Sequence, residues 1–185
     1  MIIHYFPRLY DIYVKLTHKP KRYEIASQII GSGSVLDIGC GTGLLAKYLS
    51  PKANYLGIDL NEKHLSFAKK KGLEVKKMDC MDVEKYPERD VYFICDLLHH
   101  INPDHEKLID NLVDRFPDKK IIVSEPYVIG NWAYEQIVKI LDYDYVNKVW
   151  RPEWYEKDKL EKFFRENLGA EKVMEIEDDL VGIRS

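Results

Sequence analysis

Hydrophobic and polar positions follow two alternating patterns along this chain. Short runs rich in β-branched and apolar residues predict strands, and the longer segments between them space their apolar residues as helices do. The strands are expected at 34–39, 54–59, 73–79, 90–95 and 119–125. Strands that alternate with helices in this way form a parallel sheet with helices on both faces.

Several of the helical segments have recognisable ends. The stretch 44–50 opens a helix directly after the first strand. A second helix is expected to start at the cap residue Asn61 and to end at Gly72. In "NPDHEKLIDNLVDRFP", Asn102 is the expected cap and Pro103 the first helical residue, ahead of an apolar stripe.

The two ends of the chain depart from this alternation. Before the first strand, "HYFPRLYDIY" and "KRYEIASQII" predict one or two helices, the first crowded with aromatic residues. After residue 125, helical spacing recurs at roughly 131–149 and 158–168, and Asp158 with Glu161 forms an imperfect capping box for the second stretch. Finally, "AEKVMEIED" and "LVGIRS" predict two strands joined by a turn so short that they must be antiparallel.

These elements predict one α/β domain over 1–185, because 185 residues suffice for a single core. The expected sheet is doubly wound and seven-stranded, mostly parallel, with an antiparallel strand near one edge and helices on both faces. We divide the domain into a helical cap (1–30), a central half (31–125), and a helical insertion with the closing strand pair (126–185).

Composition and charge narrow the class of protein. Hydrophobic residues at 45% and charged residues at 32% are typical of a water-soluble chain, and we expect neither a membrane span nor an export signal. A net charge of -3 argues against nucleic acid as a partner. The three cysteines form no CxxC pair, which favours a reducing, cytoplasmic location. They do not have the spacing of metal ligands either, so we predict no metal site.

The segment "VLDIGCGTG" places three glycines within five positions, immediately after the first predicted strand. In open parallel sheets, ligands bind at the carboxyl ends of the strands, where strand order reverses. Asp59 ends the second predicted strand, 20 residues after Gly39. A carboxylate there can accept hydrogen bonds from both hydroxyls of a ribose, so the pair of features suggests a nucleoside-containing ligand.

The pattern differs from the dinucleotide fingerprint. That fingerprint needs a third glycine where this chain has Leu44, and Asp37 stands where its carboxylate would repel a pyrophosphate. A carboxylate at this position instead attracts a cationic amino group. The expected ligand is therefore a nucleoside with a positively charged end.

These residues resemble the class I methyltransferases that use S-adenosylmethionine and release S-adenosylhomocysteine. "VLDIGCGTG" is similar to the first motif of that family, "YLGIDLNEKHLSFAKK" to the second, and "FICDLLHHI" to the segment that ends its fourth strand. The resemblance covers most of residues 30–125 and implies a Rossmann-like fold. It also implies roles for individual residues: the methionine portion of the cofactor at Asp37, Gly39, Gly41, Gly43 and Cys95, the ribose at Asp59, and the adenine at Leu60, Asp79 and Cys80. Cys40, within the glycine loop, is expected to contact the cofactor as well.

The acceptor is expected after the fourth and fifth strands. Asp96, His99 and His100 are candidates for a catalytic base, with capping, packing or surface exposure as the alternative roles. A base is optional, because methyl transfer from a sulfonium chiefly needs alignment and exclusion of water. Further candidates, for acceptor binding, are Glu125 and Tyr127 at the fifth strand and Tyr10 and Tyr13 in the aromatic first segment, which we expect to act as a lid.

The sequence thus predicts a methyltransferase that acts on a small molecule by in-line methyl transfer. The stretch "CDLL" after the fourth strand lacks the proline and aromatic pattern common in methyltransferases of nucleobase amines, which disfavours DNA or RNA. Two alternatives stay open: a module that binds S-adenosylmethionine without turnover, and a methyltransferase of RNA or protein. The sequence fixes neither the acceptor nor the oligomeric state.

Overall fold

The computed structural model describes residues 7–8, 12, 21–127, 143–144, 149–150, 155–177 and 179–185. The predicted lid residues Tyr10 and Tyr13 lie outside them, as does most of the expected first helix.

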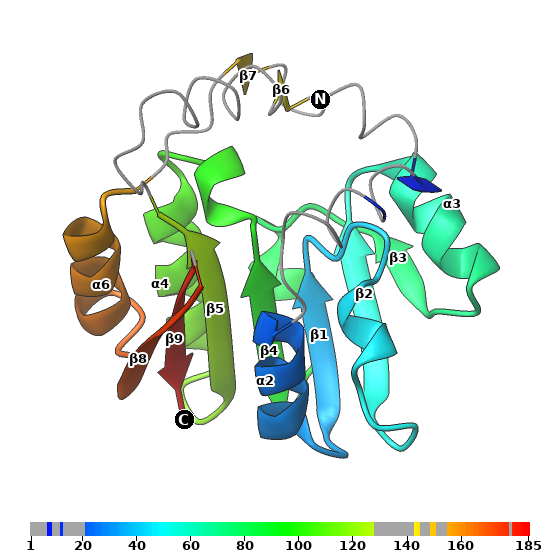
Figure 1. Cartoon of the computed structure of the whole chain (residues 1–185), viewed down its shortest axis with the longest axis horizontal. Coiled ribbons are helices and arrows are strands. Elements are labelled where there is room, and N and C mark those ends of the chain that lie inside the picture. The colour runs from blue at the N-terminus through cyan, green and yellow to red at the C-terminus, as the bar shows by residue number, and fades with distance from the viewer. Residues whose placement is uncertain are drawn as a thin grey trace.

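A seven-stranded sheet forms the centre of the molecule, in the order β3-β2-β1-β4-β5-β9-β8 (Figure 1). Neighbours from β3 to β5 are parallel, whereas β9 runs antiparallel to both β5 and β8. The predicted fold class is confirmed, including the antiparallel strand near one edge. The strands are β1 (Ser34–Ile38), β2 (Asn54–Asp59), β3 (Val75–Lys77), β4 (Val91–Cys95), β5 (Lys120–Pro126), β8 (Lys172–Ile176) and β9 (Asp179–Arg184).

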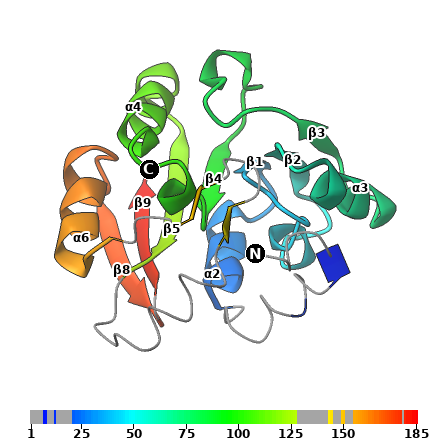
Figure 2. The same ribbon diagram turned by 90° about the horizontal axis from the view of Figure 1, so that it is seen from above.

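Helices cover both faces of the sheet (Figures 1 and 2). On one face lie α4 (His105–Arg115) and α6 (Lys157–Glu166), whose apolar residues join one core cluster with the central strands. On the other lie α2 (Lys21–Ile30) and α3 (Glu62–Lys70), whose separate clusters both include Tyr55 of β2. Since parallel strands have both faces buried, their apolar runs are continuous, as the sequence pattern predicts.

The helix predicted over 44–50 is wrong. Only a 3-10 turn forms there, over Leu45–Lys47. Positive φ angles at the three loop glycines keep the backbone out of helical geometry before residue 44, and Pro51 disfavours helix in the residue before it. Too few residues are left for a regular helix.

The ends of the other predicted helices are partly confirmed. Asn61 caps α3 with its side-chain oxygen, which accepts from the main-chain NH groups of Lys63 and His64. Asn102 is not a cap, because a 3-10 helix over Leu98–His100 and the turn after it delay the start of α4 until His105.

Two predictions in the C-terminal part are also corrected. The helix at 158–168 exists as α6 but starts at Lys157, which puts Asp158 inside its first turn rather than at the cap. In the stretch predicted as helix at 131–149, the described residues form two short antiparallel strands, β6 (Tyr143–Asp144) and β7 (Val149–Trp150). Tyrosine and valine suit a pleated surface better than a helix. Residues 131–142 and 145–148 of this stretch lie outside the described residues.

None of the helices in the described part of the chain is both long enough and apolar enough to cross a lipid bilayer.

Candidate functional site

The glycine loop bends sharply at the carboxyl end of β1. Gly39, Gly41 and Gly43 have φ angles of +72°, +52° and +74°, a region that other residues rarely adopt. The main-chain NH groups of Gly39 and Cys40 both donate to the carbonyl of Ile58, at 2.9 Å each, which ties the loop to the end of β2. The bare backbone that the sequence shows here is therefore required by the turn itself.

Protein neighbours also explain two of these glycines. A Cβ on Gly39 would lie 3.0 Å from Leu97, and one on Gly43 would lie 2.4 Å from Leu73. The loop is thus packed from behind by apolar side chains that leave no space for a larger residue.

Asp59 at the end of β2 is fixed by main-chain donors. One carboxylate oxygen accepts from the NH of Gly41 at 2.7 Å, and the other accepts from the NH of Asn61 at 2.7 Å. A carboxylate can accept about four hydrogen bonds, so lone pairs remain on both oxygens of this half-buried group. Asp59 is rigid and has acceptor capacity left, as a diol-binding residue requires.

Asp37 is the second-to-last residue of β1, with only 4% of its surface exposed. Burial raises the pKa of Asp37 to about 7; the hydrogen bond from Tyr55 opposes the rise, and the charge of Asp59 adds to it. The Tyr55 hydroxyl donates to the Asp37 carboxylate at 2.8 Å. A buried carboxyl with a pKa this close to neutrality is ready to ionise when a cation approaches.

Sequence reasoning missed Tyr55. Gly57 stands opposite Asp37 in the β1–β2 register, and a Cβ there would lie 2.7 Å from the Tyr55 hydroxyl oxygen. The glycine therefore gives Tyr55 the space to reach Asp37. The available signal was the strand period of two, which puts residues 55 and 57 on the same face of β2.

A cavity opens between α2 and the carboxyl ends of β1 and β4. Two of its lining side chains, Asp37 and Asp96, are acidic, and none of the described residues that line it is basic. Such a cavity favours a ligand with a cationic group over an anionic one. Its lining consists of Tyr23, Asp37, Gly39, Cys40, Thr42, Leu44, Leu45, Phe93, Cys95 and Asp96.

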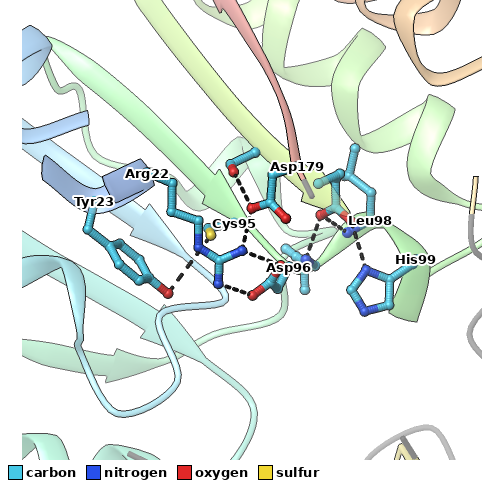
Figure 3. Close-up of polar contacts among 10 residues, drawn as sticks. Arg22, Tyr23, Cys95, Asp96, Leu98, His99 and Asp179 are labelled. Atoms are coloured by element: carbon cyan, nitrogen blue, oxygen red, sulfur yellow. Dashed lines mark hydrogen bonds and ion pairs between the residues drawn. The ribbon is translucent and has the colours of Figure 1, made fainter. Parts of the chain in front are cut away.

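A buried ion cluster borders this cavity (Figure 3). The guanidinium of Arg22, only 4% exposed, donates to both carboxylate oxygens of Asp96 at 2.9 and 2.5 Å and also to Asp179. Ser124 donates to the same Asp179 oxygen at 3.0 Å. The cluster joins the start of α2 to the end of β4 and the start of β9, an arrangement that no local sequence pattern announced.

Glu125 is fully buried at the end of β5 and organises the loop after β4. One of its oxygens accepts from the NH groups of Leu97 and Leu98, at 2.7 Å each. The other oxygen lies 2.7 Å from Nδ1 of His99, which is 5% exposed (Figure 3). These bonds hold Asp96 at a φ of +52°, a conformation that a short polar residue tolerates.

The other predicted residues lie around the same end of the sheet. The half-buried His100 has its ring centroid 4.1 Å from that of His99. Tyr127 is buried and donates its hydroxyl to Glu175 of β8. Asp79 accepts from the NH of Met81 at 2.9 Å, and Leu60 and Cys80 are half-buried after β2 and β3.

The three cysteines are free thiols, and two of them, Cys40 and Cys95, line the cavity. Burial raises the pKa of Cys80 to about 12 and the pKa of Cys40 and of Cys95 still more clearly. Groups of three or more His, Cys, Asp or Glu side chains fit to hold a metal ion are not found among the described residues.

Comparisons with known proteins show which proteins this chain resembles. Residues 35–116 match a sequence family described as Methyltransferase domain. This central part of the chain is therefore similar to methyltransferase domains. The matched segment runs from the first residues of β1 to the end of α4, so it includes the glycine loop, Asp59 and the loop after β4.

Two curated relatives are named as methyltransferases. The chain is 29% identical to trans-aconitate 2-methyltransferase of Mycobacterium tuberculosis over 124 residues, which is 63% of this chain and 47% of the relative. It is 27% identical to ubiquinone biosynthesis O-methyltransferase of Rickettsia conorii over 146 residues, 65% of this chain and 50% of the relative. The matches thus span about half the length of these relatives.

Solved structures share this fold. The structure described as a DhpI-SAM-HEP complex superposes with a TM-score of 0.70 and 16% identity, covering 100% of this chain and 94% of that one. An S-adenosylmethionine-dependent methyltransferase from Clostridium acetobutylicum gives a TM-score of 0.66 at 16% identity, with 99% and 98% covered. Both likenesses extend over the whole architecture, including the closing antiparallel strands.

Proposed function

We propose that this protein transfers the methyl group of S-adenosylmethionine to a small-molecule acceptor. The observation that carries the proposal is the loop at Gly39 to Gly43 with a carboxylate on either side of it. Asp59 accepts from the main-chain NH of Gly41, and Asp37 accepts from the Tyr55 hydroxyl. The matched family supports the reaction class, and the names of the curated relatives, trans-aconitate 2-methyltransferase and ubiquinone biosynthesis O-methyltransferase, support a small acceptor.

The residues present fit this cofactor. Asp59, fixed by main-chain donors and with lone pairs left, would hold the ribose hydroxyls. Asp37, which is buried and has a pKa raised to about 7, would hold the amino group. The glycine loop would let the amino-acid portion approach the main chain, and the half-buried Leu60, Asp79 and Cys80 would border the adenine.

When bound, S-adenosylmethionine supplies an activated methyl group on a sulfonium. The chain would then have to align the acceptor and exclude water. Glu125 contributes by holding the NH groups of Leu97 and Leu98, which sets the loop after β4 on the acceptor side. We infer that His99 is a positioning residue: its buried ring contacts the Glu125 carboxylate, and Glu125 in turn holds the loop after β4. That Asp96, His99 or His100 takes a proton from the acceptor stays a prediction.

Calorimetric titration with S-adenosylmethionine, S-adenosylhomocysteine and NAD tests the binding half of the proposal. We expect the first two to bind and NAD not to bind. Gly41→Val is the matched negative control, because valine at a φ of +52° disrupts the loop without changing charge. Binding of NAD alone would overturn the proposal.

A second assay tests turnover. The protein is incubated with S-adenosylmethionine and a small-metabolite extract, and S-adenosylhomocysteine is measured over time by mass spectrometry. Production above that of the Gly41→Val protein supports an enzyme of small molecules. Tight binding without production, with small metabolites and with RNA or protein fractions alike, would instead identify a binding module.

A further inference from the structure

The two halves of the glycine loop are held by different parts of the chain. In the first half, the NH groups of Gly39 and Cys40 donate to a carbonyl of β2, and the NH of Gly41 donates to Asp59. The second half, residues 42–43, lies against the carboxyl end of α3 and the turn that follows it. This end of α3 is far from the acceptor side of the site, so its contacts bear on the cofactor loop alone.

Apolar side chains from α3 and the following turn pack against the back of the loop. Figures 1 and 2 show α3 beside β2 and β3. Cys40 shares a buried cluster with Leu65 and Ala68 of α3. Leu73, in the turn, lies so close to Gly43 that a Cβ there would be 2.4 Å away. The loop therefore rests directly on this part of the chain.

A charged side chain adds a polar contact to this packing. The ammonium of Lys71, the residue directly after α3, donates to the carbonyl of Thr42 at 3.0 Å. The ring of Phe67, one turn earlier in the helix, has its centroid 4.4 Å from the same ammonium. Thr42 is fully buried and lines the cavity, whereas Lys71 does not. Lys71 thus holds the main chain of a cavity residue from outside the cavity.

A lysine at the end of a helix has an ordinary role, which is to offset the partial negative charge of the last carbonyl groups. Lys69, Lys70 and Lys71 are all placed for it. The first two are exposed, as that role allows, but Lys71 is half-buried with its ammonium on the glycine loop. Because a charge-assisted hydrogen bond is stronger than a neutral one, this contact can keep the loop carbonyl in one direction.

The segment around α3 contacts the site at both of its ends. At its start, the NH of the cap residue Asn61 donates to Asp59, the carboxylate proposed to hold the ribose. At its end, Lys71 holds Thr42 in the loop proposed to receive the amino-acid portion. The two portions of the cofactor are thus served by opposite ends of one helix.

We propose that Lys71 is a positioning residue: its bond to the Thr42 carbonyl holds the second half of the glycine loop in the conformation that receives the amino-acid portion of S-adenosylmethionine. This inference rests on the proposed function, because it concerns the same loop. Lys71 acts through the main chain of the loop. A change at this residue should therefore affect binding of the amino-acid portion and leave binding of the nucleoside intact.

Two ligands that differ in the amino-acid portion test this role. S-adenosylhomocysteine has that portion, whereas 5′-methylthioadenosine keeps the nucleoside and the sulfur and has a methyl group in its place. Their dissociation constants are measured by calorimetry in the wild type and in Lys71→Met. We expect the variant to bind S-adenosylhomocysteine about three- to tenfold more weakly. Its affinity for 5′-methylthioadenosine should stay within about twofold of the wild type.

Two further variants separate positioning from loss of charge. Lys70→Met is the matched control, because it removes the same charge from the adjacent, exposed residue and should bind both ligands as the wild type does. Lys71→Arg keeps a charged donor and should recover much of the affinity for S-adenosylhomocysteine. Hydrogen exchange on the ligand-free proteins reports on the loop directly. Its amides over 39–44 should exchange faster in Lys71→Met than in Lys70→Met.

The outcomes separate this inference from the proposed function. Equal affinities in Lys71→Met and Lys70→Met, an equal loss of both ligands in Lys71→Met, or unchanged exchange over the loop overturns the positioning role while the proposed cofactor stands. A wild-type protein that binds neither ligand overturns the proposed function itself. A loss confined to S-adenosylhomocysteine, with faster exchange in the loop and recovery in Lys71→Arg, supports the inference.

Discussion

The two halves of the sheet hold their acidic residues in different ways. At the ends of β1 and β2, Asp59 is fixed by the main-chain NH groups of Gly41, in the glycine loop, and of Asn61, two residues further along the chain. At the ends of β4, β5 and β9, Asp96 and Asp179 are fixed by one arginine that comes from α2, 74 and 157 residues away. The first half is a local motif, whereas the second is assembled from the whole chain.

This difference matters for function. A carboxylate that is fixed by the backbone keeps its position whatever surrounds it, which suits a cofactor common to many enzymes. A carboxylate that depends on a distant side chain is set by the particular chain, which suits the selection of ligands.

The largest effect is expected from Arg22→Met. Methionine keeps much of the volume but removes the buried guanidinium that pairs with the buried Asp179 and the half-buried Asp96, and breaking a buried ion pair typically costs about 3–5 kcal/mol of unfolding free energy. Chemical denaturation measures this loss. Lys21→Met is the control, since Lys21 is exposed and adjacent. Equal stability of the two variants would show that the ion cluster of Arg22, Asp96 and Asp179 does not stabilise the fold.

Asp59→Ala should act chiefly on binding. It removes the acceptor of the Gly41 and Asn61 NH groups and the expected partner of the ribose. Hydrogen bonds to a charged group are worth about 1.5–3 kcal/mol, so the affinity for S-adenosylhomocysteine should fall by about 10- to 150-fold in calorimetry. An unchanged affinity would remove Asp59 from the site.

Asp37 predicts a proton-linked affinity. Because burial raises its pKa to about 7, the ligand-free carboxyl is mostly protonated at pH 6 and must lose that proton to hold an ammonium group. Binding should therefore release roughly one proton per ligand at pH 6 and weaken on the order of five- to tenfold per unit below pH 7. Calorimetry in buffers of different ionisation enthalpy counts the protons. Release that persists in Asp37→Asn would assign it to another group.

The sequence predicted correctly those features that are determined by residues close together along the chain. The strands, the closing antiparallel pair and the cap Asn61 follow from local patterns, because period and capping are local properties. The helix at 44–50 failed since its local signal ignored the backbone already committed to the loop. The partners of Asp96 and Asp37 depend on how strands are ordered and on which face each residue points to.

Arg22 illustrates that limit. In the sequence it belongs to a short basic run that looks like a solvated surface, and its burial depends on the carboxylates that the sheet order brings to it. Glu125 and His99 were found as candidate residues, but their contact with each other required the register of β4 and β5. The identities of such residues are visible in a sequence, whereas their partners are not.

The smallest effect, and the sharpest probe of the cofactor half, is Tyr55→Phe. The variant keeps the ring beside Gly57 and removes only the hydroxyl that donates to Asp37 at 2.8 Å. Because this bond lowers the pKa of Asp37, its loss should move the pH midpoint of S-adenosylmethionine binding upward and cost about 1 kcal/mol of affinity near neutral pH. At a pH well above the new midpoint the two proteins should converge.

Tyr92→Phe is the matched control for this measurement. It removes another hydroxyl from a buried tyrosine, one that donates to the carbonyl of Pro87 at 3.2 Å and does not line the cavity. A loss of affinity in Tyr55→Phe that is constant across pH would mean that Tyr55 supports the shape of β2 and not the ionisation of Asp37. A shift confined to the acidic limb would instead show that Tyr55 opposes the rise in the pKa of Asp37, much as Arg22 opposes the rise in the pKa of Asp179.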